Sequence, residues 1–192
     1  STLNIEVGNV LRVPFIKSES DIIKYVDEAI HLSKIDWDSF EISPDFRRLH
    51  LVNKNVLTIK EAWESFSNYS DTLVNKLKLI EEKLNSVLIQ SYGLSDALEP
   101  NILANEITLN LNSEFKFPNK EDHHELYRSE ALVNLLNYCL GCMMGRYSLD
   151  QEGLVYAHSG NEGFKELDTN GAYQSFPADD DGIIPLASEE WL

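Results

Sequence analysis

One predicted helix constrains the fold of this 192-residue chain more than any other feature. From Thr58 to about Ser91, apolar side chains recur at alternating steps of three and four residues, with one gap near Ser70. The positions are Trp63, Phe66, Leu73, Leu77, Ile80, Leu84 and Val87. A helix of about 33 residues spans on the order of 50 Å, more than a small globule needs. The pattern predicts a strut or half of a helical hairpin, against the alternative of an ordinary long helix packed on its own domain.

The other segments predict further helices and minor strands. Residues 19–35 carry an apolar helical face behind a serine cap, and residues 126–147 form an apolar helix. Short strands are predicted near 3–14 and near 105–112, because apolar and polar residues alternate there. The predicted fold class is therefore mainly α with minor β (α+β), arranged as a helical bundle or spacer around the long helix.

The charge balance argues against a free-standing DNA-binding domain. The chain has 16 basic and 32 acidic residues and a formal net charge of −16, whereas binding to the phosphate backbone depends on Lys and Arg that displace counterions. Acidic residues dominate the chain after Tyr147, and the cations lie mostly upstream, with Arg47 and Arg48 adjacent to each other. At 43% hydrophobic residues the chain is apolar enough to fold and bury a core.

Cys139 and Cys142 form a C-x-x-C pair that could belong to a metal or redox site. A zinc site would need two further ligands from the histidines, and no second C-x-x-C is present. A thioredoxin-like pair begins a helix, whereas these cysteines fall inside one. The two thiols and Met143 share one predicted helical face, which favours small apolar core side chains in a reducing compartment. A metal-dependent enzyme that uses the two cysteines and a histidine is the alternative.

Other sequence motifs of catalysis are incomplete. The sequence HHELYR at 123–128 begins like a zincin motif but has Arg128 where the second histidine is needed. Neither a phosphate-binding G-x-x-x-x-G-K-[ST] loop nor a G-x-S-x-G nucleophile elbow occurs, and the acidic run at 179–181 lacks the spacing of an EF-hand. The chain contains no apolar run of the roughly 20 residues that a membrane span needs. It begins without Met, and both ends predict a piece of a longer protein.

Arg146 and Tyr147, at the end of the apolar helix, are the main candidate contact residues. A cation at a helix C-terminus is favoured by the helix dipole by roughly 0.3–1 kcal/mol, which alone could explain Arg146. Alternatively, Arg146 pairs with Asp150 or Glu152, or contacts a phosphate. The sequence leaves these alternatives open, and the basic Arg47 and Arg48 complete the set of candidate contacts.

Four blocks of the sequence resemble one family. They are LNIEVGNVLRVPF at 3–15, IDWDSFEISPDFRRLHL at 35–51, YCLGCMMGRYSLDQEGLVYA at 138–157 and FPADDDGIIPL at 176–186. In this order they resemble the later part of the PglX proteins, the adenine-specific DNA methyltransferases of BREX phage-defence systems, which are related to large single-chain restriction-modification enzymes. The third and fourth blocks are the most specific.

The resemblance implies a parent enzyme that binds S-adenosylmethionine in a Rossmann-like domain and holds a flipped adenine in a Pro-Pro-Tyr loop. The six prolines of this chain are never adjacent, so that loop is absent from it. No catalytic, cofactor-binding or metal-binding residue can therefore be assigned to this segment, which we expect to be inactive alone.

The resemblance also implies a place in the parent, downstream of the catalytic domain. Residues 1–16 would end a strand-rich upstream module, 17–147 would form a helical spacer domain, and 148–192 an acidic, loop-rich connector. The expected function is a non-catalytic structural and target-recognition segment of a cytoplasmic enzyme. Its partners would be the rest of the parent polypeptide, double-stranded DNA through the parent, and other defence-system proteins, with no membrane. The alternative is an autonomous acidic protein-interaction module, for example a DNA mimic.

Overall fold

Helices form the framework of the molecule, and the residues that the structure describes contain no strand. The computed structural model describes residues 7–12, 14–16, 20–52, 55–156, 160 and 163–177. Its elements in chain order are α1 (Val7–Val10), α2 (Ser20–Asp38), α3 (Ile59–Ser91), the 3-10 helix η1 (Ala104–Glu106), α4 (Ser113–Lys116), α5 (His123–Met143) and α6 (Phe164–Thr169).

The long helix is confirmed as α3, with 33 residues. Thr58 caps it in an extended conformation, since its side-chain oxygen accepts a hydrogen bond from the Glu61 backbone N–H at 3.2 Å. The Glu61 carboxylate accepts in return from the backbone N–H of Thr58, which completes a capping box. At the other end Gly93 has a φ of +66°, and Leu94 donates to the Ile89 carbonyl. This arrangement ends the helix at the glycine, as the sequence predicts.

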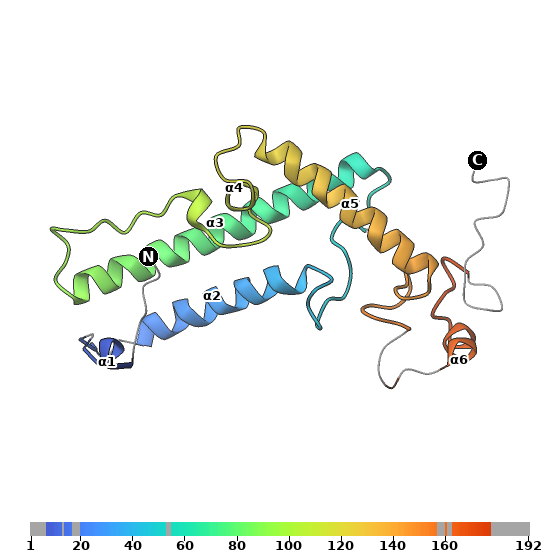
Figure 1. The fold of residues 1–192 in the computed structure, drawn as a ribbon, viewed down its shortest axis with the longest axis horizontal. Coiled ribbons are helices and arrows are strands. Elements are labelled where there is room, and N and C mark those ends of the chain that lie inside the picture. The colour runs from blue at the N-terminus through green and yellow to red at the C-terminus, as the bar shows by residue number, and fades with distance from the viewer. Residues whose placement is uncertain are drawn as a thin grey trace.

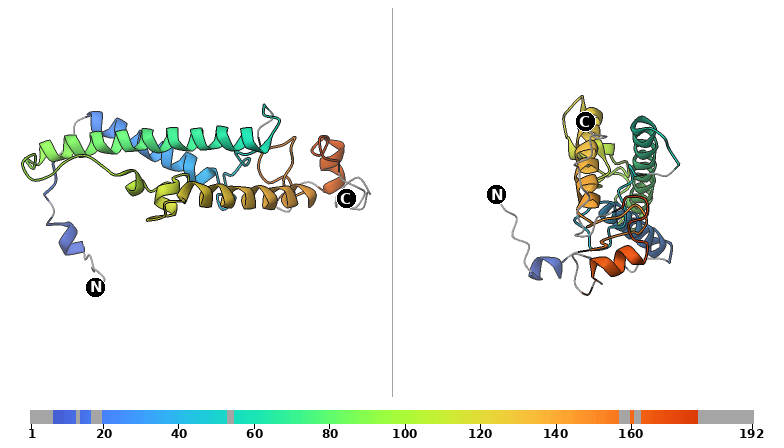
Figure 2. Two further views of the ribbon diagram at one scale, coloured as in Figure 1. Left: turned by 90° about the horizontal axis from the view of Figure 1, so that it is seen from above. Right: turned by 90° about the vertical axis from the view of Figure 1, so that its right-hand side faces the viewer.

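Helices α2 and α3 run antiparallel beside each other (Figure 1), so α3 is half of a helical hairpin. The salt bridge between Lys76 of α3 and Glu28 of α2, at 2.8 Å, links their facing sides. Figure 2 shows α2, α3 and α5 end-on as three separate rods. The main core lies among them and contains Leu32, Leu51, Ala62, Phe66, Leu73, Val74, Leu77, Ile80, Ile107, Leu109, Leu111, Tyr127 and Ala131.

The strand predicted near 105–112 is wrong. Ile107, Leu109 and Leu111 are 0%, 1% and 2% exposed, so the alternation correctly marked residues that face the core. However, the segment passes between helices as η1, turns and irregular backbone, and the residues that the structure describes contain no strand beside it. Turns fold its backbone, since Leu109 donates to the Ile107 carbonyl at 2.9 Å and Asn112 to the Leu109 carbonyl at 3.0 Å. The two-residue period of burial therefore arose here without a β-strand.

The carboxylate of Asp36 binds the backbone of this segment. Asp36 is 4% exposed, and its two oxygens accept hydrogen bonds from the backbone N–H of Asn110 at 3.0 Å and of Leu111 at 2.8 Å. The Asn110 side chain donates a third at 3.1 Å. Asn112 is also buried, and its amide donates to the carbonyls of Ala104 and Ile107. Side chains rather than a sheet thus satisfy the backbone of this segment.

The strand predicted near 3–14 is also wrong for the described part. Residues 7–10 form α1, a single helical turn, and residues 11 and 12 continue as a turn. Residues 3–6 and 13 lie outside the described residues. Gly8 falls inside this turn, and alternation around it was the basis of the strand prediction. Without a neighbouring strand, so short an alternating segment gains nothing from an extended conformation.

Candidate functional site

The four predicted contact residues come together at the C-terminal end of α5. Arg47 and Arg48 belong to the segment after α2, about a hundred residues before Arg146 and Tyr147. The Gly153 N–H donates to the Arg47 carbonyl at 2.7 Å, and the Arg48 guanidinium donates to the Leu149 carbonyl at 3.3 Å. The fold therefore joins two of the blocks on which the family resemblance rests.

Tyr147 is the buried centre of this site. It is 2% exposed, its ring stacks on Tyr138 at 5.0 Å, and Phe46 packs edge-on at 5.6 Å. The hydroxyl donates to the Glu41 carboxylate at 3.1 Å. Burial, followed by the charge of Glu41, raises the pKa of Tyr147, so the phenol remains a neutral donor at physiological pH. Tyr147 is thus a packing anchor and has no free surface for a ligand.

A Schellman motif ends α5 and places Arg146. The Arg146 N–H donates to the Gly141 carbonyl at 2.8 Å, and Gly145 donates to Cys142 at 3.0 Å. Gly145 has a φ of +72°, which a residue with a Cβ would adopt only with strain. A Cβ on Gly141 would lie 2.6 Å from the Tyr147 ring. The backbone conformation therefore explains Gly145, and the close packing of Tyr147 explains Gly141.

Arg146 and Arg47 both expose their guanidinium groups. The guanidinium carbon of Arg146 lies 5.4 Å from the centre of the Tyr147 ring, within the range of a cation–π contact. Arg47 pairs with Glu152 at 3.5 Å, and both side chains are largely exposed. Glu152 was a predicted partner of Arg146, and the structure pairs it with Arg47 instead. Asp150 binds the backbone and side chain of Ser175.

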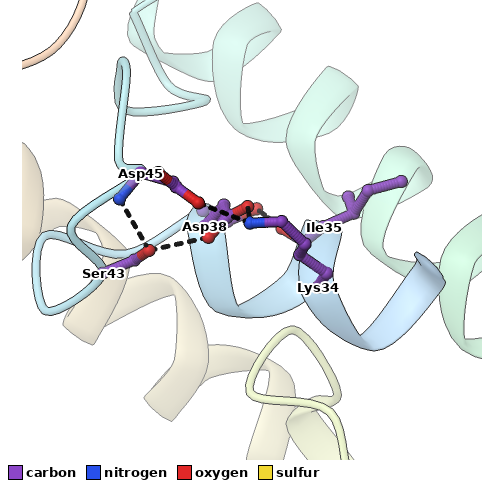
Figure 3. Close-up of polar contacts among 6 residues, drawn as sticks. Lys34, Ile35, Asp38, Ser43 and Asp45 are labelled. Atoms are coloured by element: carbon purple, nitrogen blue, oxygen red, sulfur yellow. Dashed lines mark hydrogen bonds and ion pairs between the residues drawn. The ribbon is translucent and has the colours of Figure 1, made fainter. Parts of the chain in front are cut away.

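A polar network fixes the turn that carries Phe46, Arg47 and Arg48 into the site (Figure 3). Lys34 donates to the carboxylates of Asp38 at 2.8 Å and Asp45 at 2.6 Å. Ser43 donates to Asp38 at 2.7 Å and accepts from the Asp45 N–H. The hydrogen bond from Lys34, followed by that from Ser43, lowers the pKa of Asp38. The turn is thus organised by paired charges.

A hollow of about 1370 Å³ opens beside this turn, and its walls carry charges of both signs. Lys34 and Arg47 face it but already pair with acids, so they form no dedicated anion site. Arg48 Nε is buried without a hydrogen-bond partner among the described residues. The His50 ring stacks on Tyr69 at 4.6 Å, and burial lowers its pKa. The Ser39 hydroxyl lies 3.1 Å from His50 Nε2 in the wall of this hollow, but it donates its proton to the Ile35 carbonyl at 2.7 Å, so His50 does not act as its base in this arrangement.

The two cysteines differ, which partly corrects the prediction. Cys142 is buried, as expected, but Cys139 is exposed. The buried face of α5 consists of Tyr127, Ala131, Tyr138, Gly141 and Cys142, displaced by one residue from the predicted face. Burial raises the pKa of Cys142 to about 11 and also raises that of Cys139. Both thiols therefore remain protonated at neutral pH, which makes them poor nucleophiles.

The metal alternatives find no support in the described part. No group of three or more His, Cys, Asp or Glu side chains suited to a metal gathers among the residues that the structure describes. His123 interacts with the Ser113 hydroxyl at 2.9 Å at the start of α5. His158 and the acidic run at 179–181 lie outside the described residues. Among the residues that the structure describes, no helix has the length and apolarity to cross a membrane.

Comparison with known proteins finds homologues of the chain. No family model matches the chain. The adenine-specific methyltransferase BrxX of Escherichia coli O9:H4 (strain HS) is 40% identical over 196 residues, covering 100% of this chain. The chain is homologous to one segment of the BrxX and PglX methyltransferases. The adenine-specific methyltransferase PglX of Lacticaseibacillus casei (strain Zhang) is 28% identical over 202 residues, again covering 100% of the chain.

The chain spans only 16% of the length of BrxX and 15% of that of PglX. The resemblance to the PglX family is therefore confirmed over the whole chain. Several residues of the site around Tyr147 were missed as site residues from sequence: Phe46, Tyr138, Gly141 and Glu41. Aromatic residues beside Arg47 and within α5 were visible signals, but their mutual stacking depends on a contact between distant segments.

Proposed function

We propose that this chain is a non-catalytic structural and target-recognition segment of a BREX-type adenine-specific DNA methyltransferase that acts in phage defence. The observation that carries the proposal is the match to BrxX over the whole chain, at 40% identity, within a relative of which the chain spans 16%. S-adenosylmethionine and the target adenine would be bound by other parts of the parent. The parent protein would bind double-stranded DNA and other defence-system proteins.

The geometry supports a spacer. Helix α3 is about 50 Å long at 1.5 Å per residue, and beyond Ile80, its last fully buried residue, its side chains are at most partly buried. At that far end, the Tyr92 hydroxyl donates to the Pro14 carbonyl at 2.8 Å. The Tyr147 site and α6 lie at the opposite end of the helical body (Figure 1). The helices thus separate the upstream from the downstream attachment.

This arrangement gives each part of the chain a proposed role. Residues 1–16 would lead from the upstream module, residues 17–147 would set distance and angle, and residues 148–192 would connect to the downstream module. Arg47, Arg48, Arg146 and Tyr147 would hold the connector on the spacer. Three contacts with the connector support this role: the Arg48 guanidinium donates to the Leu149 carbonyl at 3.3 Å, Arg47 pairs with Glu152 at 3.5 Å, and the Val155 N–H donates to the Arg146 carbonyl at 3.0 Å.

Insertions into α3 of the parent enzyme test the proposal. Four residues inserted after Glu82 should rotate the far end of α3 by about a tenth of a turn and lengthen it by about 6 Å. Seven residues should lengthen it by about 10 Å with a similarly small rotation. We expect both variants to bind S-adenosylmethionine normally and to lose most site-specific methylation, measured by protection of plasmid DNA in cells.

The matched control is a seven-residue insertion after Ser95, in the exposed segment that follows α3. It leaves the length of α3 unchanged, and methylation should persist. Full methylation by both helix insertions would contradict the spacer role.

A further inference from the structure

The outer face of α5 exposes an apolar stripe. Val133, Leu136, Leu140 and Met144 are 54%, 65%, 54% and 73% exposed. Their spacing of three, four and four residues puts them on one side of the helix. Cys139 lies on the same outer side and is exposed as well. We call the surface of these four apolar residues the α5 stripe.

The α5 stripe belongs to a helix that is apolar on both sides. Tyr138 and Cys142 on the inner side are buried against Phe46 and Tyr147. From Ala131 to Gly145 the sequence contains no charged residue, in a chain of which 25% of the residues are charged. A helix that is apolar all round is normally buried on all sides, whereas the residues that the structure describes cover this one on the inner side and leave the four stripe residues exposed.

A hollow of mixed lining borders the α5 stripe. Trp37 and Ile42 are exposed and line this hollow of about 410 Å³ together with Asn137 of α5. Asn137 lies one helical turn from Val133 and from Leu140. The lining also contains the charged Glu41, Lys116 and Glu130. An apolar centre bordered by polar side chains is typical of a protein interface.

Leu79 of α3 is an exposed leucine among charged residues and serves as a comparison for the α5 stripe. It is 57% exposed, close to the value of Leu140. Its helical neighbours Lys76, Lys78, Glu82 and Lys83 are charged, so it stands alone in a polar surface. Single exposed apolar residues need no partner, whereas a contiguous stripe does.

We propose that the α5 stripe is an interface for another part of the parent methyltransferase polypeptide, which presents an apolar surface to it. The inference rests on the proposed function. The relatives are several times longer than this chain, which spans 16% and 15% of them, so ample polypeptide is available to cover the stripe. A second copy is a poorer occupant, because each copy carries a formal charge of −16 and the copies repel each other.

Cys139 reports directly on the coverage of the stripe. A maleimide is reacted with the isolated 192-residue segment and with the full parent, and the label is located by peptide mass spectrometry with fragmentation between the two cysteines. We expect Cys139 to react in the isolated segment and to react at least about tenfold more slowly in the parent, because thiol reactivity follows exposure. Buried Cys142 is the internal reference and should be slow in both.

Substitutions test the same surface without relying on the thiol. Leu140→Asp should leave the melting temperature of the isolated segment within about 2 °C, since the side chain is exposed. In the parent it should open the interface and restore rapid labelling of Cys139. Leu79→Asp is the matched control, and it should leave Cys139 protected in the parent.

Each outcome decides the proposal. Equal labelling of Cys139 in the parent and the segment would overturn it, as would protection in the isolated monomer or in a dimer of the segment, since the occupant would then be this chain itself. The readout is independent of methylation. A failed α3 insertion test would remove the spacer role and leave protection of Cys139 measurable, whereas unprotected Cys139 would remove the interface and leave the spacer role standing.

Discussion

Asp36 is the residue that most changes the interpretation of the sequence. Its carboxylate accepts three hydrogen bonds from Asn110 and Leu111 inside the protein. Two of the donors are the backbone N–H groups of the consecutive residues Asn110 and Leu111, which lie in a turn and both bind this one carboxylate. A buried donor that loses its partner costs about 1–3 kcal/mol, so the position of the 107–111 segment depends on this side chain.

Asp36→Ala should therefore destabilise the isolated segment by about 3 kcal/mol, because it leaves buried backbone N–H groups unpaired and opens a small cavity. The measurement is chemical unfolding followed by circular dichroism. Asp27→Ala is the matched control: it lies on the same helix, is exposed, and should change the free energy of unfolding by no more than about 0.5 kcal/mol. Equal effects of the two variants would mean that the contact of Asp36 is not needed for stability.

At the scale of the element, α3 is one helix whose two parts differ in burial. From Ala62 to Ile80 it has a buried face that includes the interruption at Ser70, whose hydroxyl donates to the Phe66 carbonyl at 3.0 Å. Beyond Ile80 no residue of the helix is fully buried. The hydrophobic repeat continues through this second part, where its side chains are partly buried or exposed.

The cost of truncating a leucine should therefore depend on its position along α3. Leu77 is 2% exposed and Leu88 is 41% exposed. Leu77→Ala should lower the free energy of unfolding by about 2–5 kcal/mol, whereas Leu88→Ala should change it by about 0.5 kcal/mol or less. Thermal and chemical denaturation of the isolated segment would measure both. A comparable loss for Leu88→Ala would show that the far end of α3 is packed in solution.

At the scale of the whole molecule, the net charge bears on how this segment could serve in a longer protein. The chain matches two adenine-specific methyltransferases over its whole length, yet it carries a formal charge of −16. Arg47, one of its exposed cations, pairs with Glu152. Its net negative charge and the pairing of Arg47 make this segment poorly suited to bind a phosphate backbone by itself.

The isolated segment should accordingly bind neither duplex DNA nor S-adenosylmethionine at physiological salt. Repulsion between the acidic chain and the phosphates opposes the first, and the proposed location of the cofactor domain elsewhere in the parent opposes the second. Fluorescence anisotropy with labelled duplex and calorimetry with the cofactor measure these affinities, with the intact parent as the positive control. Micromolar binding of either ligand by the segment would contradict the spacer role.

Local patterns were predictable to different degrees. Thr58, Glu61 and Gly93 carry the signals of a helix start and stop in their own chemistry, and the structure has them there. The period of Ile107, Leu109 and Leu111 correctly indicated burial but was wrong about the strand. Cys139 was placed inside because a helix that is apolar on both sides has no clear inner face in its sequence.

The sequence by itself determined the long helix, its ends and the resemblance to PglX, because these depend on residues close together or on matching blocks. The predicted α+β class was wrong, since the described residues form helices and contain no strand. Only the tertiary structure decided that Asp36 binds the turn at Asn110 and Leu111, that Tyr147 stacks on Tyr138 and meets Phe46 edge-on, and which side of α5 is covered. These features depend on which distant segments meet. Periodicity marks an apolar face but not the element that covers it.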